Sequence, residues 1–446
     1  MPDHAHSDDP AVQRQLDRLA ALSVGDTLGL ERIQALLDRV GNPEAALPPV
    51  LHVAGTNGKG STCAYLRAML EAAGHSVHVY TSPHLVRFNE RIRVADRLIE
   101  DEALARHLGR VLDAAGNGEP DDIRPSFFEA TTAAAFLAFA ETPADACIVE
   151  VGLGGRLDAT NVIAQPIACG IAQLGLDHQQ FLGDRLDDIA GEKAGVAKHG
   201  VPLVTQHYPA AIGDRIGHVA HEAGADWLPR GGPWDAAVYQ HRLHYRDGDG
   251  KLELPLPRLA GQHQAMNAAL AVAMLRHQRR LAIPPSAYRA GIGWAQWPAR
   301  LQRLGPGPLT ALLPEDSQLW LDGGHNPAAA RAIADYFRGH VPAGGDFHIV
   351  FGLLANKDLG GVLRAFTGRE ALVHAVPVPG HAHHAPEAIA AAANANGFNA
   401  MTAADPASAL RWIARHADRA RPPIVLIMGS LYLAGTVLAA NGEVPD

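Results

Sequence analysis

A glycine-rich loop is the feature that most narrows the folds open to this chain of 446 residues. It follows the apolar run PPVLHVA and precedes CAYLRAMLEAAG, whose spacing is helical. The loop consists of Gly55, Thr56, Asn57, Gly58, Lys59, Gly60 and Ser61. Glycines between a strand and a helix N-terminus let backbone N–H groups approach phosphate oxygens, while a lysine and a hydroxyl serve the outer phosphates and Mg²⁺. The loop therefore predicts a phosphate site.

This loop departs from the general phosphate-loop pattern at two positions. Val53 stands where the first glycine is usual, and Gly60 separates the lysine from the hydroxyl of Ser61. The alternative interpretation is a glycine turn without a ligand. The order of strand, loop, lysine, hydroxyl and helix favours the phosphate site.

The rest of the chain alternates between apolar strands and helical segments, which predicts an α/β fold with a mainly parallel sheet. Short strands with turns over 227–259 predict a small antiparallel addition. Prolines and glycines in WPARLQRLGPGP place a domain boundary near Pro298, after which the alternation restarts. We therefore expect one domain over 1–297 and a smaller α/β domain over 298–446.

Composition excludes several classes of protein. The formal net charge of −9 argues against broad binding to nucleic acid, which favours basic surfaces. Three cysteines in apolar stretches cannot form a disulfide framework and are expected to be buried thiols. No apolar run is long enough to cross a membrane, and the polar N-terminus has no signal-peptide core. A cytoplasmic, monomeric protein is expected.

Further motifs occur in order along the chain. They are LGLERI (28–33), TSPHLVRFNERI (81–92), SFFEATTAAAF (126–136), EVGLGGRLDATN (150–161), LGLDHQQFLGD (174–184), GEKAGV (191–196), LDGGHNP (321–327), FGLLANKD (351–358) and MGS (428–430). Together with the glycine-rich loop, this set resembles the folylpolyglutamate synthase and dihydrofolate synthase family of the Mur ligase superfamily. The resemblance covers nearly the whole chain.

The resemblance implies a Mur-ligase-type ATP-binding domain with a Rossmann-like domain after it. It implies a ligase that uses ATP and Mg²⁺ to add L-glutamate to dihydropteroate and to tetrahydrofolates through an acyl phosphate. Three alternatives stay open: folylpolyglutamate synthesis only, another Mur-type amino-acid ligase, and a P-loop ATPase switch. Only about 50 residues precede the loop, which leaves little room for the UDP-sugar domain typical of peptidoglycan Mur ligases.

Several candidate residues concern the metal and the catalytic step. Glu150 ends an apolar strand at the edge where α/β sheets bind ligands, so its carboxylate suits Mg²⁺; an ion pair with Arg156 is the alternative. The resemblance implies metal contacts for Ser61, Ser82 and His178, although Ser82 could instead cap a turn and His178 could be structural or a general base.

Lys193 in GEKAGV is a candidate for a chemically modified side chain near the metal. The resemblance implies that CO₂ carboxylates this lysine, which converts a cation into an anion near the metal. The alternative is a surface pair with Glu192.

The resemblance also implies ligand contacts. For ATP it implies Asn267, Arg300, Asp322 and, more weakly, His325. For the pterin ring it implies Leu28, Gly29, Leu30, Phe127, Phe128, Glu129, Leu157, Asp158 and Ala159, where the phenylalanines could stack on the ring or simply begin a core helix. For glutamate it implies Lys357, Asp358 and Ser430. The histidine-rich segment His381, His383 and His384 has no partner cluster in the sequence and is interpreted as a polar loop.

Overall fold

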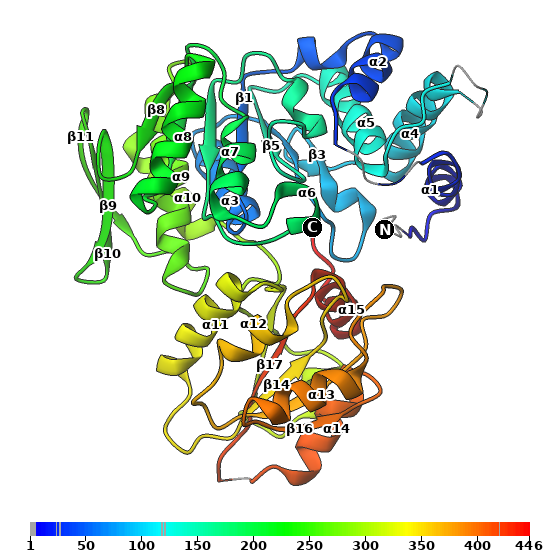
Figure 1. Ribbon diagram of the computed structural model, residues 1–446, viewed down its shortest axis with the longest axis vertical. Coiled ribbons are helices and arrows are strands. Elements are labelled where there is room, and N and C mark those ends of the chain that lie inside the picture. The colour runs from blue at the N-terminus through cyan, green and yellow to red at the C-terminus, as the bar shows by residue number, and fades with distance from the viewer. Residues whose placement is uncertain (1–5, 24, 26–27, 117–118, 120–121, 419) are drawn as a thin grey trace. The chain divides into compact units, whose positions relative to one another are not determined.

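The structure is a computed structural model that describes residues 6–23, 25, 28–116, 119, 122–418 and 420–446. The chain divides into two compact units (Figure 1). Unit 1 comprises residues 1–258 and 264–296, and unit 2 comprises residues 259–263 and 297–446. Each unit is a mixed α/β structure, which confirms the predicted fold class.

The sheet of unit 1 has eight strands in the order β4-β3-β2-β5-β1-β6-β7-β8. The strands are β1 (Val50–Ala54), β2 (Val77–Tyr80), β3 (Ile92–Val94), β4 (Arg97–Leu98), β5 (Ala146–Glu150), β6 (Ala168–Ile171), β7 (Pro202–Thr205) and β8 (Asp226–Pro229). All neighbouring pairs are parallel except those that involve β3 and β4. The central strands are buried along their whole length and are mostly apolar, because helices cover both faces of a parallel sheet.

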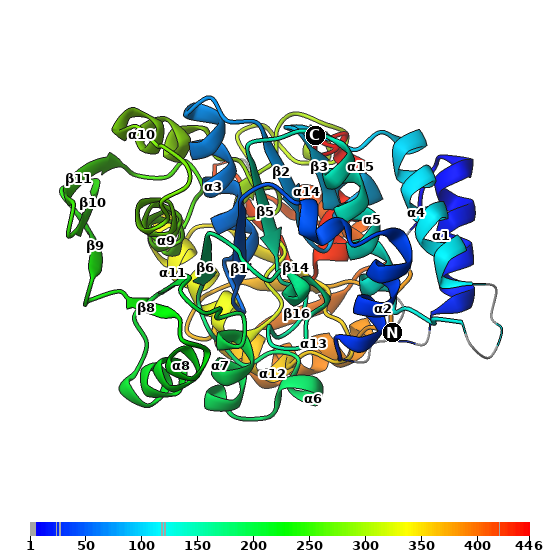
Figure 2. The ribbon, with the colours of Figure 1, turned by 90° about the horizontal axis from the view of Figure 1, so that it is seen from above.

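The α-helices of unit 1 pack in groups around this sheet. They are α1 (Pro10–Leu22), α2 (Glu31–Val40), α3 (Lys59–Ala72), α4 (Asp101–Ala115), α5 (Phe127–Glu141), α6 (Gln179–Leu182), α7 (Leu186–Ala194), α8 (Ala210–Ala223), α9 (His263–His277) and α10 (Pro285–Trp294). Helices α1, α2, α4 and α5 share one apolar cluster with β2 and β5 (Figure 2). Helices α7 and α8 share another with β6 and β7.

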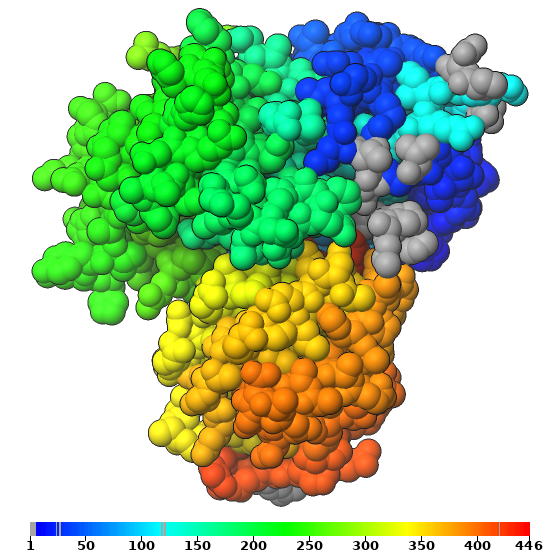
Figure 3. Space-filling model, in the orientation of Figure 1, coloured from blue at the N-terminus to red at the C-terminus, as the bar shows by residue number. Residues whose placement is uncertain are grey.

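A separate three-stranded antiparallel sheet lies at one edge of unit 1, green at the left of Figures 1 and 3. It consists of β9 (Trp234–Tyr239), β10 (Arg242–Asp247) and β11 (Gly250–Pro255), which confirms the predicted antiparallel addition. The carboxylate of Asp247 accepts bonds from Arg276 Nε and Nη2 at 2.5 and 2.6 Å and from the Tyr245 hydroxyl at 3.0 Å. This ion pair joins the end of β10 to α9.

Unit 2 has a six-stranded sheet in the order β12-β13-β17-β14-β15-β16, in which only β12 is antiparallel to its neighbour. The strands are β12 (Gln302–Arg303), β13 (Gln318–Asp322), β14 (Phe347–Phe351), β15 (Leu372–Ala375), β16 (Asn399–Thr402) and β17 (Ile424–Met428). The helices are α11 (Pro327–His340), α12 (Leu359–Arg364), α13 (Pro386–Ala395), α14 (Pro406–His416) and α15 (Leu431–Asn441).

Proline fixes the start of three helices in unit 2. Pro327, Pro386 and Pro406 each stand at the first helical position, where the missing N–H removes no helical hydrogen bond. The sequence predicts a further helix from Lys357, but α12 begins at Leu359. Asp358 is its N-cap and accepts a bond from the Gly361 backbone N–H, so the lysine stays in the preceding loop. Among the residues that the structure describes, every helix is too short or too polar to cross a bilayer.

The Arg276–Asp247 pair gives a stability prediction. We expect Arg276→Ala to lower the free energy of unfolding by about 3 kcal/mol, because it leaves the carboxylate of Asp247, 2% exposed, without its cation. Arg242→Ala is the control: Arg242 pairs with Glu253 in the same small sheet, but both side chains are more than half exposed, and the loss should stay below about 1 kcal/mol. Urea unfolding of the two variants measures the difference. Equal losses would contradict the assignment of Arg276 as the anchor.

Candidate active site

The glycine-rich loop has the predicted context of strand, loop and helix. Strand β1 ends at Ala54, and α3 begins at Lys59 with Gly58 as its N-cap. Gly58 has a φ of +86°, and a Cβ there would lie 2.5 Å from Asn267 Oδ1. Backbone conformation and close packing therefore both require glycine at this position.

Helix α9 contacts this loop through two buried amides. Gln264 Nε2 donates to Ser61 Oγ at 3.3 Å, and Asn267 Nδ2 donates to Gln264 Oε1 at 3.1 Å. On the other side, the backbone N–H groups of Thr56 and Asn57 both donate to the Gln173 carbonyl. Asn267 is among the residues predicted from the sequence, whereas Gln264, which is 1% exposed, is not. The available signal was a second amide side chain in the same helix, three positions before the asparagine and so on the same face.

Lys59 and Glu150 meet at the carboxyl edge of the sheet, with Lys59 Nζ 3.9 Å from Glu150 Oε1. Glu150 is the last residue of β5 and is 4% exposed, and its Oε2 accepts a bond of 3.4 Å from the Ser82 backbone N–H. Strand β5 lies between β2, which leads to Ser82, and β1, which leads to the loop. The strand order therefore brings together three segments that are far apart in the sequence.

The alternative ion pairs for Glu150 and Lys193 do not form in the structure. Arg156 Nη2 lies 2.8 Å from Glu192 Oε1, so Arg156 pairs with Glu192 and Lys59 is the partner of Glu150. Lys193 is buried, at 5% exposure, and is not part of a surface pair.

The oxygen atoms at this edge suit a hard cation. Glu150 supplies a carboxylate, and Ser61 and Ser82 carry hydroxyls on the neighbouring segments. Among the described residues, no group of three His, Cys, Asp or Glu side chains could hold a metal ion. Mg²⁺ is commonly held by one or two carboxylates with water and phosphate oxygens, so a single carboxylate with hydroxyl groups fits this ion.

Burial changes the chemistry of Lys193. Removal from water lowers its pKa to about 7, and the positive charge of Lys59 acts in the same direction. The carboxylates of Asp177 and Asp158 oppose this shift only in part. A large fraction of Lys193 is therefore the neutral amine near neutral pH, which is the form that reacts with CO₂.

His178 lies at the N-terminus of α6, with a φ of +51° that is unusual for a residue other than glycine. Its backbone N–H donates to Asp177 Oδ1 at 2.9 Å, and its side chain is 42% exposed. The side chain of Asp177 is only 8% exposed. Asp177 is not among the residues predicted from the sequence, although it is an acidic residue directly before the candidate histidine.

The candidate pterin residues of α5 stand in its first turn, which Ser126 caps. Phe127 makes an edge contact with Phe88, with ring centres 5.8 Å apart, and is 7% exposed. The half-buried Phe128 lies against Gly152, where a Cβ would meet its ring at 2.5 Å. Glu129 binds Arg32 and the Ser126 backbone through its carboxylate. Phe128 is therefore the less enclosed of the two phenylalanines.

Asp158 organises the loop that carries Leu157 and Ala159. Its Oδ1 accepts bonds from the Thr160 backbone N–H at 3.0 Å and from the Thr160 hydroxyl at 2.5 Å, and its Oδ2 accepts one from the Leu153 N–H at 2.8 Å. His52, fully buried in β1, lies 2.8 Å from the Thr160 hydroxyl through Nε2. Burial raises the pKa of Asp158, and these donors counteract the shift.

In unit 2, Asp322 is hydrogen-bonded to the segment that presents Arg300. Asp322 Oδ2 accepts from the Leu301 backbone N–H at 2.8 Å, and Oδ1 accepts from the Gly324 N–H at 2.6 Å. Ala299 and Leu301, on either side of Arg300, have φ values of +53° and +43°. Such strain at residues other than glycine persists only where surrounding contacts enforce it. His325 Nδ1 lies 3.2 Å from the Gly323 carbonyl, in the same loop.

The candidate glutamate residues lie beyond the carboxyl ends of adjacent strands of unit 2. Lys357 and Asp358 follow β14, and Ser430 follows β17 and caps α15. Within the histidine-rich segment, His384 Nε2 lies 3.0 Å from the Lys357 carbonyl, and His381 stacks on Tyr432 with ring centres 3.7 Å apart. These contacts tie the segment to the loop of Lys357 and to the first turn of α15.

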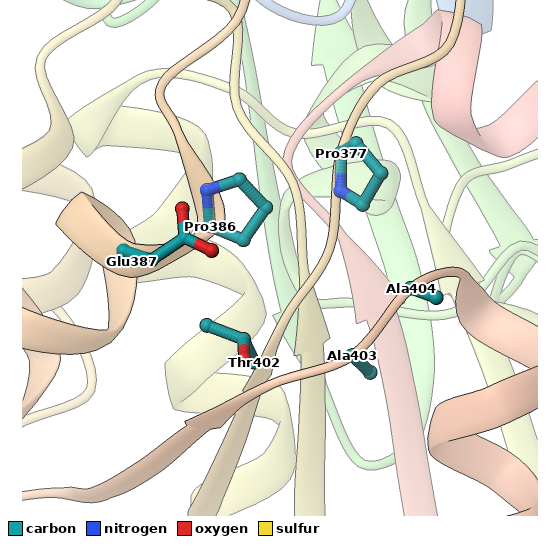
Figure 4. A pocket seen from close by; sticks show the side chains of 6 residues that line it. All are labelled: Pro377, Pro386, Glu387, Thr402, Ala403 and Ala404. Carbon is teal, nitrogen blue, oxygen red and sulfur yellow. The ribbon is translucent and has the colours of Figure 1, made fainter.

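A pocket of about 260 Å³ lies at the ends of β15 and β16 (Figure 4). It is lined by Pro377, Pro386, Glu387, Thr402, Ala403 and Ala404. Glu387 and Thr402 supply its polar side chains, and none of the candidate site residues lines it. This pocket is therefore separate from the candidate residues of unit 2.

Residues 312–431 match the family model described as "Mur ligase, glutamate ligase domain". The chain is 34% identical to the dihydrofolate synthase/folylpolyglutamate synthase of Escherichia coli (strain K12) over 92% of this chain and 90% of that protein. It is 33% identical to the enzyme of the same name from Bacillus subtilis (strain 168), over 93% of this chain and 95% of that protein.

Solved structures agree with these matches. E. coli FolC in complex with DHPP and ADP superposes with a TM-score of 0.84 at 32% identity, over 97% of both chains. Mycobacterium tuberculosis folylpolyglutamate synthase complexed with ADP and AMPPCP gives a TM-score of 0.85 at 28% identity, over 98% of this chain and 99% of that chain. The chain therefore belongs to the dihydrofolate synthase and folylpolyglutamate synthase family of Mur ligases.

Proposed function

We propose that the protein is an ATP-dependent ligase that adds L-glutamate to dihydropteroate, giving dihydrofolate, and to tetrahydrofolates, giving folylpolyglutamates. The observation that carries this proposal is the meeting of Lys59, on a phosphate-type loop, with the buried carboxylate of Glu150. The family supports the same reaction, since relatives over almost the whole chain carry both synthase names. One related structure is described with Mn, AMPPNP and L-glutamate bound.

The reaction couples two bond exchanges. A carboxylate oxygen of the pteroate or folate attacks the γ-phosphorus of ATP, and the bond from phosphorus to the oxygen of ADP breaks. The glutamate amine then attacks the acyl carbon, the carbon–oxygen bond to phosphate breaks, and the nitrogen loses a proton as the amide forms. Inorganic phosphate and ADP are the other products.

The residues of unit 1 suit the first exchange. We assign phosphate binding to the glycine-rich loop 55–61, through backbone N–H groups other than those of Thr56 and Asn57, which donate to the Gln173 carbonyl. We also assign it to Lys59, whose ammonium balances charge on the transferred group. We assign Mg²⁺ to Ser61, Ser82, Glu150 and His178; when bound, the ion neutralises phosphate oxygens. We assign to Lys193 a carbamate that acts as an additional anion beside this charge cluster.

The remaining assignments rest on the family resemblance. We propose Asn267, Arg300, Asp322 and His325 for ATP. The pterin proposal covers 28–30, 127–129 and 157–159, and the glutamate proposal covers Lys357, Asp358 and Ser430. We propose that residues 1–297 form the ATP-binding domain and residues 298–446 form the glutamate-ligase domain. A cytoplasmic monomer that does not bind nucleic acid stays a prediction.

Glutamate-dependent phosphate release tests the proposed function. Purified protein with ATP and Mg²⁺ is assayed with dihydropteroate and with a tetrahydrofolate in parallel, each with and without L-glutamate. We expect release in both series only when glutamate is present. Activity with the tetrahydrofolate alone would restrict the enzyme to folylpolyglutamate synthesis. Phosphate release at the same rate with and without glutamate would reject the ligase in favour of an ATPase.

The steric demand at Gly58 gives a prediction about nucleotide binding. We expect Gly58→Ala to weaken ADP binding by at least about tenfold, because the new methyl group would displace Asn267 and distort the loop. Gly74→Ala is the matched control. Gly74 has nearly the same φ, +87°, and lies just beyond the other end of α3, but nothing stands within 4 Å of its Cβ position. Calorimetric titration with ADP measures both variants, and equal affinities would refute the packing argument.

Lys193 gives a second prediction. We expect Lys193→Ala to bind ATP but to lose nearly all turnover, and added acetate to restore part of it by supplying an anion in the vacated space. Lys198→Ala is the control: Lys198 is also partly buried and donates to the Asn161 carbonyl, but it is no part of the proposed site, so acetate should have no effect.

Labelling of the wild-type protein with ¹³CO₂ tests the carbamate directly. The carbamate signal should increase as pH rises through about 7, because only the neutral amine reacts. A protein without label at any pH would show that Lys193 acts unmodified.

A further inference from the structure

An ion pair joins two helices that are distant in the sequence. Arg32 Nη2 lies 2.9 Å from Glu129 Oε1, and Arg32 Nε lies 3.1 Å from Glu129 Oε2, across a separation of 97 residues. Arg32 stands in the first turn of α2, and Glu129 stands in the first turn of α5. The two helices pack together within one apolar cluster (Figures 1 and 2). A two-point contact of this kind fixes orientation as well as distance.

The carboxylate of Glu129 is fully engaged in this arrangement. It is 4% exposed, and besides Arg32 it accepts a bond of 2.6 Å from the Ser126 backbone N–H. The bond from Ser126 completes the capping box of α5 and requires only an acceptor oxygen. The arginine is what balances the buried charge. Glu129 therefore links the two helices, and its proposed part in the pterin site is to hold the site in place rather than to bind the ring.

The linked helix ends carry the two groups of candidate pterin residues. Leu30 is the N-cap of α2 and directly follows Leu28 and Gly29. Phe127 and Phe128 open α5. Leu30 and Phe128 are both packed at the border of the same apolar cluster. A change in the spacing of α2 and α5 therefore changes the distance between the two groups.

We propose that Arg32, acting through Glu129, is a positioning residue for the pterin ring: the pair sets the spacing between residues 28–30 and the phenylalanines of α5. This inference rests on the proposed function, because it takes these segments as the two sides of the pterin site. A flat fused heteroaromatic ring needs a gap of fixed width for stacking contact. A gap fixed before binding also lowers the ordering cost of association.

Four variants test the pair. Arg32→Ala removes the ion pair. Arg32→Lys keeps the positive charge but loses the two-point contact of the guanidinium group. Glu129→Gln removes the charge but keeps an oxygen for Ser126, and the double variant Arg32→Ala/Glu129→Gln completes a cycle. Arg18→Ala is the control for a second ion pair between helices of the same cluster. Arg18 Nη2 lies 2.7 Å from Asp113 Oδ1 and joins α1 to α4, and both side chains are more exposed than Arg32 and Glu129.

The measured quantities are KM for dihydropteroate, KM for ATP and kcat. We expect Arg32→Ala to raise KM for dihydropteroate about tenfold, with KM for ATP and kcat within about twofold of wild type. Glu129→Gln should have a similar effect, the double variant should be no worse than the stronger single variant, and Arg32→Lys should lie between. Arg18→Ala should match wild type.

Other results overturn the inference. A rise in KM for ATP as large as that for dihydropteroate would show a general structural role, as would effects of the same size in Arg18→Ala. Unchanged kinetics in Arg32→Ala would show that the pair positions nothing. If Arg32→Ala does not fold, an unchanged KM in Arg32→Lys and Glu129→Gln contradicts the proposal equally. A wild-type protein that does not use dihydropteroate or a tetrahydrofolate would instead reject the proposed function, and this inference with it.

Discussion

Glu150 places a carboxylate at the end of a buried strand, where Lys59 lies 3.9 Å away and water has little access. A charge in this position must be balanced, and it is balanced by the lysine of the phosphate-type loop. The contact exists because β5 lies between β2 and β1, so that Ser82 and the loop flank the strand end. The rest of the site depends on this cluster, since Lys59 also helps to lower the pKa of the buried Lys193.

Buried polar side chains hold the other parts of both units in place. Gln264 connects the loop to α9, and Asp158 with Thr160 and His52 fixes the loop after β5. In unit 2, Asp322 holds the strained backbone beside Arg300. Each is hydrogen-bonded where water is excluded, so losing one partner costs more than the bond alone would suggest. Such groups fix the local backbone arrangement within each unit.

The sequence predicted the alternating fold, the phosphate-type loop and the carboxylate at the end of β5, because each depends on local pattern. It missed α8, which contains Gly213 and Gly217, although Ile212, Ile216 and Ala220 recur in it at helical spacing. It also missed Arg32 and Gln264, whose roles depend on partners 97 and 203 residues away. Single-sequence patterns report spacing within an element, not which elements become neighbours. The burial of Lys193 is likewise a tertiary property.

The transfer of oxygen from substrate to phosphate tests the central claim most directly. Dihydropteroate labelled with ¹⁸O in both carboxyl oxygens is turned over with unlabelled ATP and L-glutamate, and the released phosphate is examined by ³¹P NMR. Attack of the carboxylate on ATP, followed by attack of the amine, leaves one labelled oxygen in each phosphate and one in the new amide. The account predicts that result. Phosphate released without label would show that water attacks ATP and that no acyl phosphate forms.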